Sequence, residues 1–96
     1  MERVILLHGI FRTYRSMAGL AGFLEKSGYE VLNIDYPSTK HAITEIGQQL
    51  HPQIEAFLTP RQSPAHFVGY SMGGLIVRSY LKQFRPQALG RVVMLG

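Results

Sequence analysis

The feature that most restricts the fold of this sequence is an alternation of two kinds of segment. Short runs rich in Val, Ile, Leu and aromatic residues are separated by longer stretches whose apolar residues recur at helical spacing. The apolar residues of the short runs are consecutive rather than strictly alternating, which is typical of parallel strands covered on both faces. We therefore predict four strands, at residues 4–7, 30–34, 65–70 and 91–95.

Three helices are predicted between these strands, and this order is typical of an α/β protein. Their apolar positions fall at residues 17–24, 43–57 and 72–80. The first helix should end at Ser27 and Gly28. For the second, Ser38 or Thr39 is a candidate N-cap. We expect Pro52 to kink or break that helix, because proline lacks a backbone donor and clashes with the preceding turn.

Right-handed crossovers predict how these elements are arranged. The simplest sheet has strand order 2-1-3-4, with the first helix on one face and the other two on the opposite face. We therefore expect one three-layer α/β domain over residues 1–96, built on a parallel four-stranded sheet. Ligands of such sheets bind beyond the carboxyl ends of the strands, where the strand order reverses. Here that point lies between the first and third strands.

The composition excludes several classes of function. Ten Lys and Arg against six Asp and Glu leave a charge of +4, but the basic residues are scattered, which disfavours nucleic-acid binding. Cysteine is absent, which excludes disulfides and zinc–thiolate sites and fits a reducing compartment. No apolar run reaches the roughly 18 residues of a membrane span, and we expect no signal peptide because Met1 leads within three residues into the first predicted strand. We expect a cytoplasmic protein.

A glycine-flanked serine lies where the third strand meets the third helix. Gly69-Tyr70-Ser71-Met72-Gly73 matches GxSxG, which places a serine on a sharp strand-to-helix turn that needs small neighbours. The amides at the start of the helix favour negative charge beside it. A plain glycine turn is the alternative interpretation, but the position between strand and helix favours a nucleophile.

Three segments together carry a resemblance. VILLHGI (residues 4–10), LNIDYPS (32–38) and VGYSMGGL (68–75) are similar, in order and spacing, to the first half of α/β-hydrolases of the lipase and esterase kind, especially small bacterial lipases. The resemblance implies that Ser71 is the nucleophile and that the backbone amides of Ile10 and Met72 form the oxyanion hole. It implies no metal or organic cofactor. Many relatives have His at the position of Tyr70, a difference that we expect to affect packing beside the turn.

Other titratable residues are weaker candidates. His8 could act as a base beside Ser71, but in the resembled family a histidine here belongs to the structure of the oxyanion loop. Asp35 ends the second strand, roughly 10 Å from the strand of Ser71 at about 4.8 Å per strand, and is expected to shape its loop or cap the next helix. The other histidines are expected far from the serine or on the surface, namely His66, His41 and His51.

An apolar acyl pocket is a further expectation, with ordinary core packing as its alternative. The candidate lining residues are Ile10, Phe11, Tyr14, Tyr36 and Met72.

The catalytic parts expected of such an enzyme are incomplete in these 96 residues. A serine nucleophile needs a histidine base and a carboxylate, which follow the serine in this family. From Met72 to Gly96 there is no Asp, Glu or His. We therefore expect the chain alone to be nearly inactive, as the N-terminal half of a hydrolase that lacks the strands bearing the acid and the histidine. The fourth strand should be an apolar sheet edge that needs a partner.

Three hypotheses follow. The first is a serine hydrolase acting on small-molecule or lipid-like carboxylic esters. The second is a non-catalytic, truncated module that oligomerises or binds a partner through its open sheet edge. The third, a nucleotide-binding domain, is disfavoured because the first strand ends in HGIF rather than in a glycine-rich phosphate loop.

Overall fold

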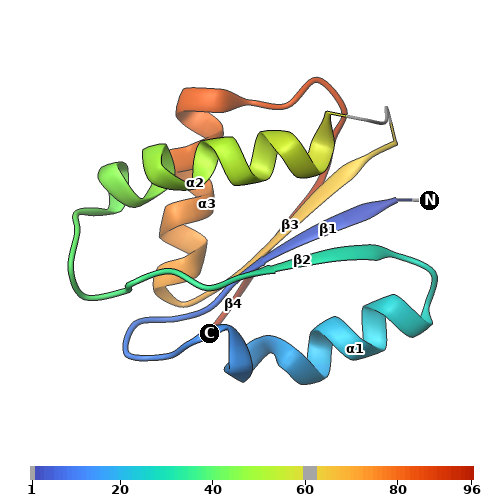
Figure 1. Ribbon diagram of the computed structural model, residues 1–96, viewed down its shortest axis with the longest axis horizontal. Helices are drawn as coiled ribbons and strands as arrows, with labels where there is room; N and C mark the ends of the chain where they lie inside the picture. The colour runs from blue at the N-terminus through green and yellow to red at the C-terminus, as the bar shows by residue number, and fades with distance from the viewer. Residues whose placement is uncertain (1, 60–62) are drawn as a thin grey trace.

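A computed structural model describes residues 2–59 and 63–96 as a twisted sheet with helices on both faces (Figure 1). In chain order the elements are β1 (Arg3–Leu7), the 3₁₀ helix η1 (Tyr14–Met17), α1 (Ala18–Lys26), β2 (Glu30–Ile34), α2 (Ile43–Leu58), β3 (Ala65–Tyr70), α3 (Met72–Phe84) and β4 (Leu89–Leu95). The strands pair in parallel in the order β2-β1-β3-β4. The predicted architecture and strand order are therefore confirmed.

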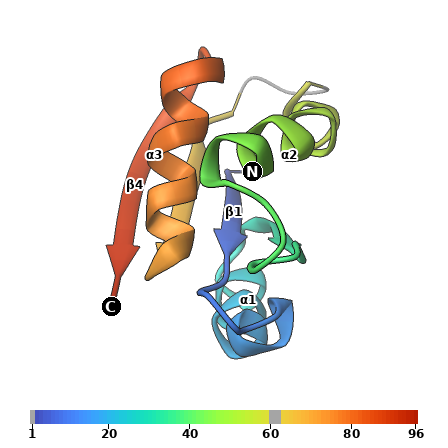
Figure 2. The same cartoon turned by 90° about the vertical axis from the view of Figure 1, so that its left-hand side faces the viewer.

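The core lies in two layers, one on each face of the sheet. Ile5 and Leu7 of β1 pack with α2 and α3, whereas Val4 and Leu6 pack on the opposite face with α1. Figure 2 shows α1 on one side of the sheet and the other two helices on the other. All four side chains are buried, because both faces of the strand are covered. This explains why the apolar residues of β1 are consecutive.

The second helix differs from its prediction at its start. It follows Ala42, whose amide donates to the Glu45 carboxylate at 3.2 Å, so neither Ser38 nor Thr39 is its N-cap. The DYPS segment continues as a loop before the helix begins. The cap is made by a glutamate at the third helical position, a backward contact that does not require a polar residue at the N-cap itself.

Of the two outcomes predicted at Pro52, a kink or a break, the break is absent. Helix α2 is continuous over 16 residues, with Pro52 exposed inside it. Its buried face extends across the proline, through Ile46, Leu50 and Ile54. Burial on both sides of Pro52 offsets the lost backbone hydrogen bond, which costs about 3 kcal/mol in an isolated helix.

The fourth strand forms an exposed edge, as expected. It begins at Leu89, two residues earlier than predicted, and its last four residues are 38–48% exposed, although all four are apolar: Val92, Val93, Met94 and Leu95. Near its start the pairing with β3 shifts register between Ala65 and Phe67. There the His66 ring accepts the Arg91 amide at 2.8 Å, so His66 lies at the end of the sheet away from Ser71.

Candidate active site

Ser71 lies in an unusual backbone conformation between β3 and α3. Its φ and ψ are 56° and −117°, and its side chain makes no capping hydrogen bond to the helix that follows. The residue is exposed. Its amide donates to the Leu95 carbonyl at 2.7 Å, which ties the turn to the end of β4. The backbone is thus fixed while the hydroxyl remains available, as a nucleophile requires.

Two glycines allow this turn to be so tight. A Cβ added to Gly69 would lie 2.5 Å from the Gly73 carbonyl carbon, and one added to Gly73 would lie 2.2 Å from the Leu7 carbonyl oxygen. Any larger side chain would therefore separate β3 from α3 or push α3 off the end of β1. The spacing of the glycines in the motif thus follows from the close approach of the backbones of β3, α3 and the end of β1.

The loop after β1 lies directly beside the serine. A Cβ added to Gly9 would be 3.2 Å from the Tyr70 carbonyl oxygen and 3.5 Å from the Ser71 Cβ. This is the juxtaposition that the strand order predicts, since β1 and β3 are neighbours. Ile10 follows Gly9 and is 44% exposed. Met72 is the first residue of α3, so its amide has no acceptor one turn earlier in the helix.

His8 is locked inside this loop. Its side chain is fully buried and stacks on Tyr36, with ring centroids 4.0 Å apart. The Nε2 atom accepts the Tyr36 amide at 3.3 Å, so the proton is assigned to Nδ1, which donates to the Gly9 carbonyl at 2.9 Å. The Tyr36 hydroxyl in turn donates to the His8 carbonyl. Both ring nitrogens are therefore occupied by the backbone, which fits a structural role and not that of a base.

Tyr36 is accordingly part of the loop support and not of an open pocket. It is only 5% exposed, and burial raises the pKa of its hydroxyl to about 12. Met72 likewise packs against the core on the α2 and α3 face. The other three candidates for an acyl pocket are exposed, namely Ile10, Phe11 and Tyr14.

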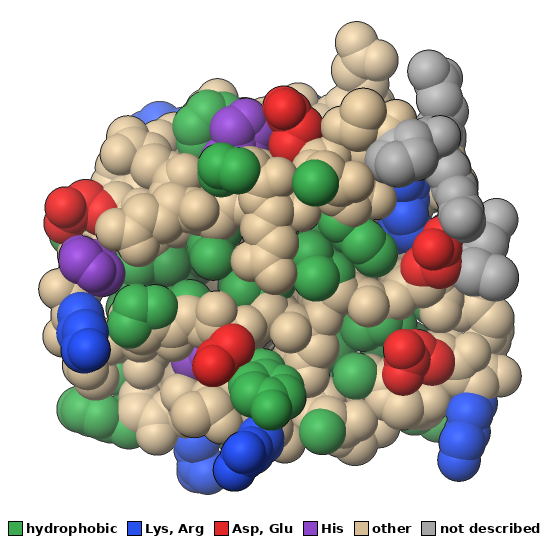
Figure 3. Space-filling model, in the orientation of Figure 1, with side chains coloured by type: hydrophobic (Ala, Val, Ile, Leu, Met, Phe, Trp, Pro, Cys, Tyr) green, Lys and Arg blue, Asp and Glu red, His purple; other side chains and the backbone are tan. Residues whose placement is uncertain are grey.

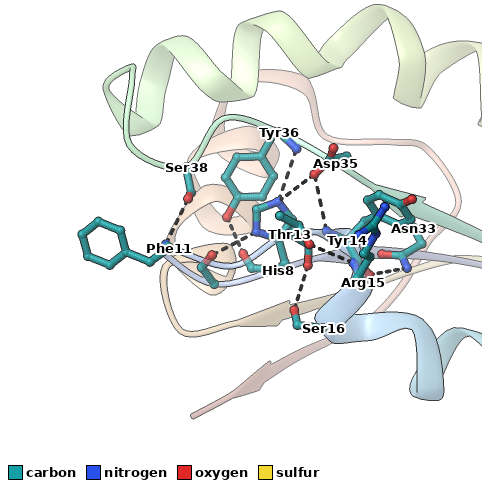
Figure 4. A network of polar contacts seen from close by, with 11 residues as sticks. His8, Phe11, Thr13, Tyr14, Arg15, Ser16, Asn33, Asp35, Tyr36 and Ser38 are labelled. Atoms are coloured by element: carbon teal, nitrogen blue, oxygen red, sulfur yellow. Dashed lines mark hydrogen bonds and ion pairs between the residues drawn. The ribbon is translucent and has the colours of Figure 1, made fainter.

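Asp35 and Ser38 hold the same loop from the end of β2 (Figure 4). The Asp35 carboxylate accepts the Tyr14 amide at 3.4 Å and lies 3.6 Å from the His8 Nε2. The hydroxyl of Ser38, which is buried, accepts the Phe11 amide at 3.1 Å. The Asp35 contacts thus support the segment after β1, whereas the sequence predicted that Asp35 would shape its own DYPS loop or cap α2. The contribution of Ser38 was not predicted, because a contact between residues 27 positions apart has no local sequence signal.

Two cavities in the structure are candidates for a substrate site. The larger, about 460 Å³, lies at the opposite end of the sheet, where the starts of β1 and β3 meet the ends of α2 and α3. The smaller, about 250 Å³, is lined by Arg12, Ser16, Met17 and Tyr70 and lies beside the loop that contacts Ser71. The larger cavity is too far from the serine to serve its chemistry, so the smaller one is the better candidate for part of a substrate site.

His51 lines the larger cavity. The sequence predicted a surface residue there, but the side chain is partly buried. Its Nδ1 accepts the Tyr80 hydroxyl at 2.8 Å, and its ring stacks on Phe84 at 3.8 Å between centroids. The Tyr80 hydroxyl is buried, which raises its pKa to about 12. His51 is thus partly buried, with its side chain 30% exposed, joins α2 to α3 beside the larger cavity, and is remote from Ser71.

The residues for completing a catalytic triad are not found beside Ser71. Within residues 2–59 and 63–96, no histidine or carboxylate forms a hydrogen bond with its hydroxyl, and no group of three metal-ligating side chains occurs. The four histidines are committed elsewhere or lie outside the site. What this part of the chain supplies is an exposed serine, a helix N-terminus and an adjoining loop of backbone amides.

Comparisons with known proteins identify the class. A family model described as alpha/beta hydrolase fold matches residues 2–96, and the chain therefore belongs to the α/β-hydrolase family. No curated protein matches the sequence.

Two solved structures share the fold. One is an extracellular alpha/beta-hydrolase from a Paenibacillus species, described as sharing structural and functional homology with tobacco salicylic acid binding protein 2. Its identity is 20% and its TM-score 0.69, over 98% of this chain and 40% of that one. The other is the phospholipase PlaB from Legionella pneumophila in complex with thio-NAD, with 16% identity and a TM-score of 0.72, over 98% of this chain and 25% of that one. The chain thus spans less than half the length of either structure.

Every helix among the described residues is too short or too polar to span a bilayer.

Proposed function

We propose that this chain carries the nucleophile and oxyanion hole of a serine hydrolase that acts on carboxylic esters. The observation that carries the proposal is the conformation of Ser71, with φ of 56° and ψ of −117°, directly beside the loop at Gly9. We propose that this geometry presents the hydroxyl to the backbone amides of Ile10 and Met72, and the family assignment supports hydrolysis.

In the proposed reaction the Ser71 Oγ attacks the ester carbonyl carbon as a base removes its proton. The negative charge on the carbonyl oxygen is stabilised by the backbone amides of Ile10 and Met72. The bond to the alcohol oxygen then breaks, the alcohol leaves with a proton, and water hydrolyses the acyl-serine. Within residues 2–59 and 63–96 no histidine or carboxylate forms a hydrogen bond with the Ser71 hydroxyl, so we propose that these 96 residues alone hydrolyse esters very slowly.

The substrate is proposed to be a small-molecule or lipid-like ester. The exposed hydrophobic side chains of Ile10, Phe11 and Tyr14 lie on the loop beside Ser71, and the likeness to a phospholipase agrees with an acyl substrate. We place the reaction in the cytoplasm on the basis of the absence of cysteine.

The test is labelling by a fluorophosphonate, which reacts with activated serines. The protein expressed from its complete reading frame should be labelled, and Ser71→Ala should abolish labelling. Ser27→Ala, at the exposed end of α1, is the matched control and should leave it unchanged. Persistent labelling of Ser71→Ala, or none of the wild-type protein, would contradict the proposal.

A second function is favoured by one observation, the apolar edge at β4. Its last four side chains are 38–48% exposed, and its outer backbone groups face no strand in residues 2–59 and 63–96. We propose as the alternative a non-catalytic module that pairs through this edge with a second copy or another partner. A stable, specific dimer without esterase activity, which Val93→Lys converts to a monomer, would support this alternative. A monomeric wild-type chain would exclude self-association.

A further inference from the structure

Phe11 is held in solvent beside the candidate active site. Its side chain is 82% exposed, the highest value among the large hydrophobic residues that the structure describes. Its φ of 59° is left-handed, which is uncommon for a bulky residue. The Ser38 hydroxyl accepts its amide, and Figure 4 shows the ring directed away from this network. The chain therefore fixes an aromatic side chain outward at a conformational cost.

Other exposed hydrophobic residues lie on the segment that carries Phe11 or next to that segment. Ile10 is 44% exposed, Tyr14 39% and Tyr70 44%. Tyr70 reaches the loop through Gly9, since a Cβ added there would lie 3.2 Å from its ring. We call these four residues the rim surface: Ile10, Phe11, Tyr14 and Tyr70. Several exposed hydrophobic residues gathered at one edge of the sheet favour an interaction site more than scattered single residues do.

The charges next to the rim surface are mainly positive. Arg12 and Arg15 are exposed within the same loop and η1, and no Asp or Glu occurs between Glu2 and Glu25. Asp35 is the acidic side chain that contacts this segment; its carboxylate accepts the Tyr14 amide and is 59% exposed, so two arginines face one carboxylate here. Figure 3 shows hydrophobic and basic side chains along the lower left of the molecule, over the loop after β1 and the start of α1.

We propose that the rim surface docks this protein on an anionic lipid surface, with the Phe11 ring entering the interface and Arg12 and Arg15 meeting the lipid phosphates. An exposed aromatic residue flanked by arginines fits the boundary between headgroups and acyl chains, because the ring is apolar and the guanidinium groups bind phosphate. Docking in this orientation brings Ser71 to the interface where lipid-like esters lie. That consequence rests on the proposed hydrolase function, whereas the docking itself does not.

A single-tryptophan reporter tests the proposal, because the sequence contains no tryptophan. Phe11→Trp places the reporter at the tip of the loop. Phe23→Trp, at a residue 66% exposed on α1, is the matched control. Both are titrated with phosphatidylcholine vesicles with or without phosphatidylglycerol, and with polyglutamate. Circular dichroism checks that each variant is folded.

Vesicles with phosphatidylglycerol should shift the emission of residue 11 to the blue and protect it from iodide, and should leave residue 23 unchanged. Arg12→Gln with Arg15→Gln should weaken binding about 30-fold, from about fivefold per charge near an anionic surface. Phe11→Ser in the wild-type background should also weaken vesicle cosedimentation, whereas Phe23→Ser should not.

Four outcomes would overturn the proposal. The first is no shift at residue 11, and the second is an equal shift at both reporters. In the third, residue 11 is already protected before vesicles are added, which means that another part of the protein covers it. In the fourth, it responds to polyglutamate but not to vesicles, which assigns the surface to an acidic protein. None of these readouts uses catalysis, so loss of fluorophosphonate labelling and loss of docking are separable.

Discussion

Replacing Ser71 by glycine should make the protein more stable. The φ and ψ of Ser71, 56° and −117°, match the first central position of a type II′ turn, about +60° and −120°, where glycine predominates. The serine side chain makes no capping hydrogen bond, so its removal loses no such contact. Ser71→Gly therefore removes a steric conflict between Cβ and the backbone at little other cost.

The magnitude can be worked from the backbone. A residue held in such a region costs about 1–3 kcal/mol. Glycine also has more conformational freedom in the unfolded chain, and this entropy reduces the gain in stability by about 0.5–1 kcal/mol. The net gain is about 0.5–2 kcal/mol, and in a domain of this size each kcal/mol raises the Tm by about 4–8 °C. Ser71→Ala retains Cβ and should lie within about 0.5 kcal/mol of the wild type.

Urea and thermal unfolding of the 96-residue chain, followed by circular dichroism, measure this difference. Ser27 is the control position, because its φ is −86° and its hydroxyl donates to the Phe23 carbonyl. There glycine should be no better than alanine. If Ser71→Gly proves no more stable than Ser71→Ala, the serine is not strained, and the inference that folding energy is given up at this turn is wrong.

Two further predictions concern the packing around the turn and the buried hydroxyls. Gly73→Ala should destabilise by about 3 kcal/mol in urea unfolding, because its Cβ would lie 2.2 Å from the Leu7 carbonyl oxygen, whereas Gly22→Ala, in open space on α1, should not destabilise. Tyr36 and Tyr80 have pKa values raised from 10.0 to about 12, so their contribution to stability is complete below pH 10 and lost between pH 10 and 12. Tyrosinate absorbance should show two residues titrating late, and one common titration near pH 10 would contradict this.

The fold was predictable because the sequence patterns that indicate it are local, and because the handedness of the crossovers restricts the strand order. Consecutive apolar residues indicated strands buried on both faces, and right-handed crossovers then left one simple strand order. The start of α2 was not predictable in the same way, since Ser38 resembles an N-cap but its hydroxyl accepts the distant Phe11 amide instead. Likewise, the penalty for Pro52 is offset by tertiary burial of Ile46, Leu50 and Ile54, which a single helix does not reveal.

The candidate site was only partly predictable. The GxSxG motif points to Ser71 as the candidate. Because β3 and α3 approach closely, only small residues fit at Gly69 and Gly73, and this requirement is visible in the sequence. The support of the facing loop leaves no such pattern. His8 is held by Tyr36, a residue 28 positions away, and their contact follows from the pairing of β1 with β2. Strand order therefore had to be known before these partners could be named.

The backbone gives evidence for the site that is independent of the motif. Among the described residues other than glycine, positive φ values occur only at Phe11 and Ser71. These two residues lie on different loops, 60 positions apart in the sequence, yet both belong to the edge of the sheet where β1 and β3 end. Strained residues persist where the surrounding structure fixes them, and they cluster at functional sites. We propose that the strained backbone at Ser71 presents the hydroxyl and that the strained backbone at Phe11 presents the ring, so that this edge of the sheet would combine the proposed nucleophile with the proposed lipid-binding surface.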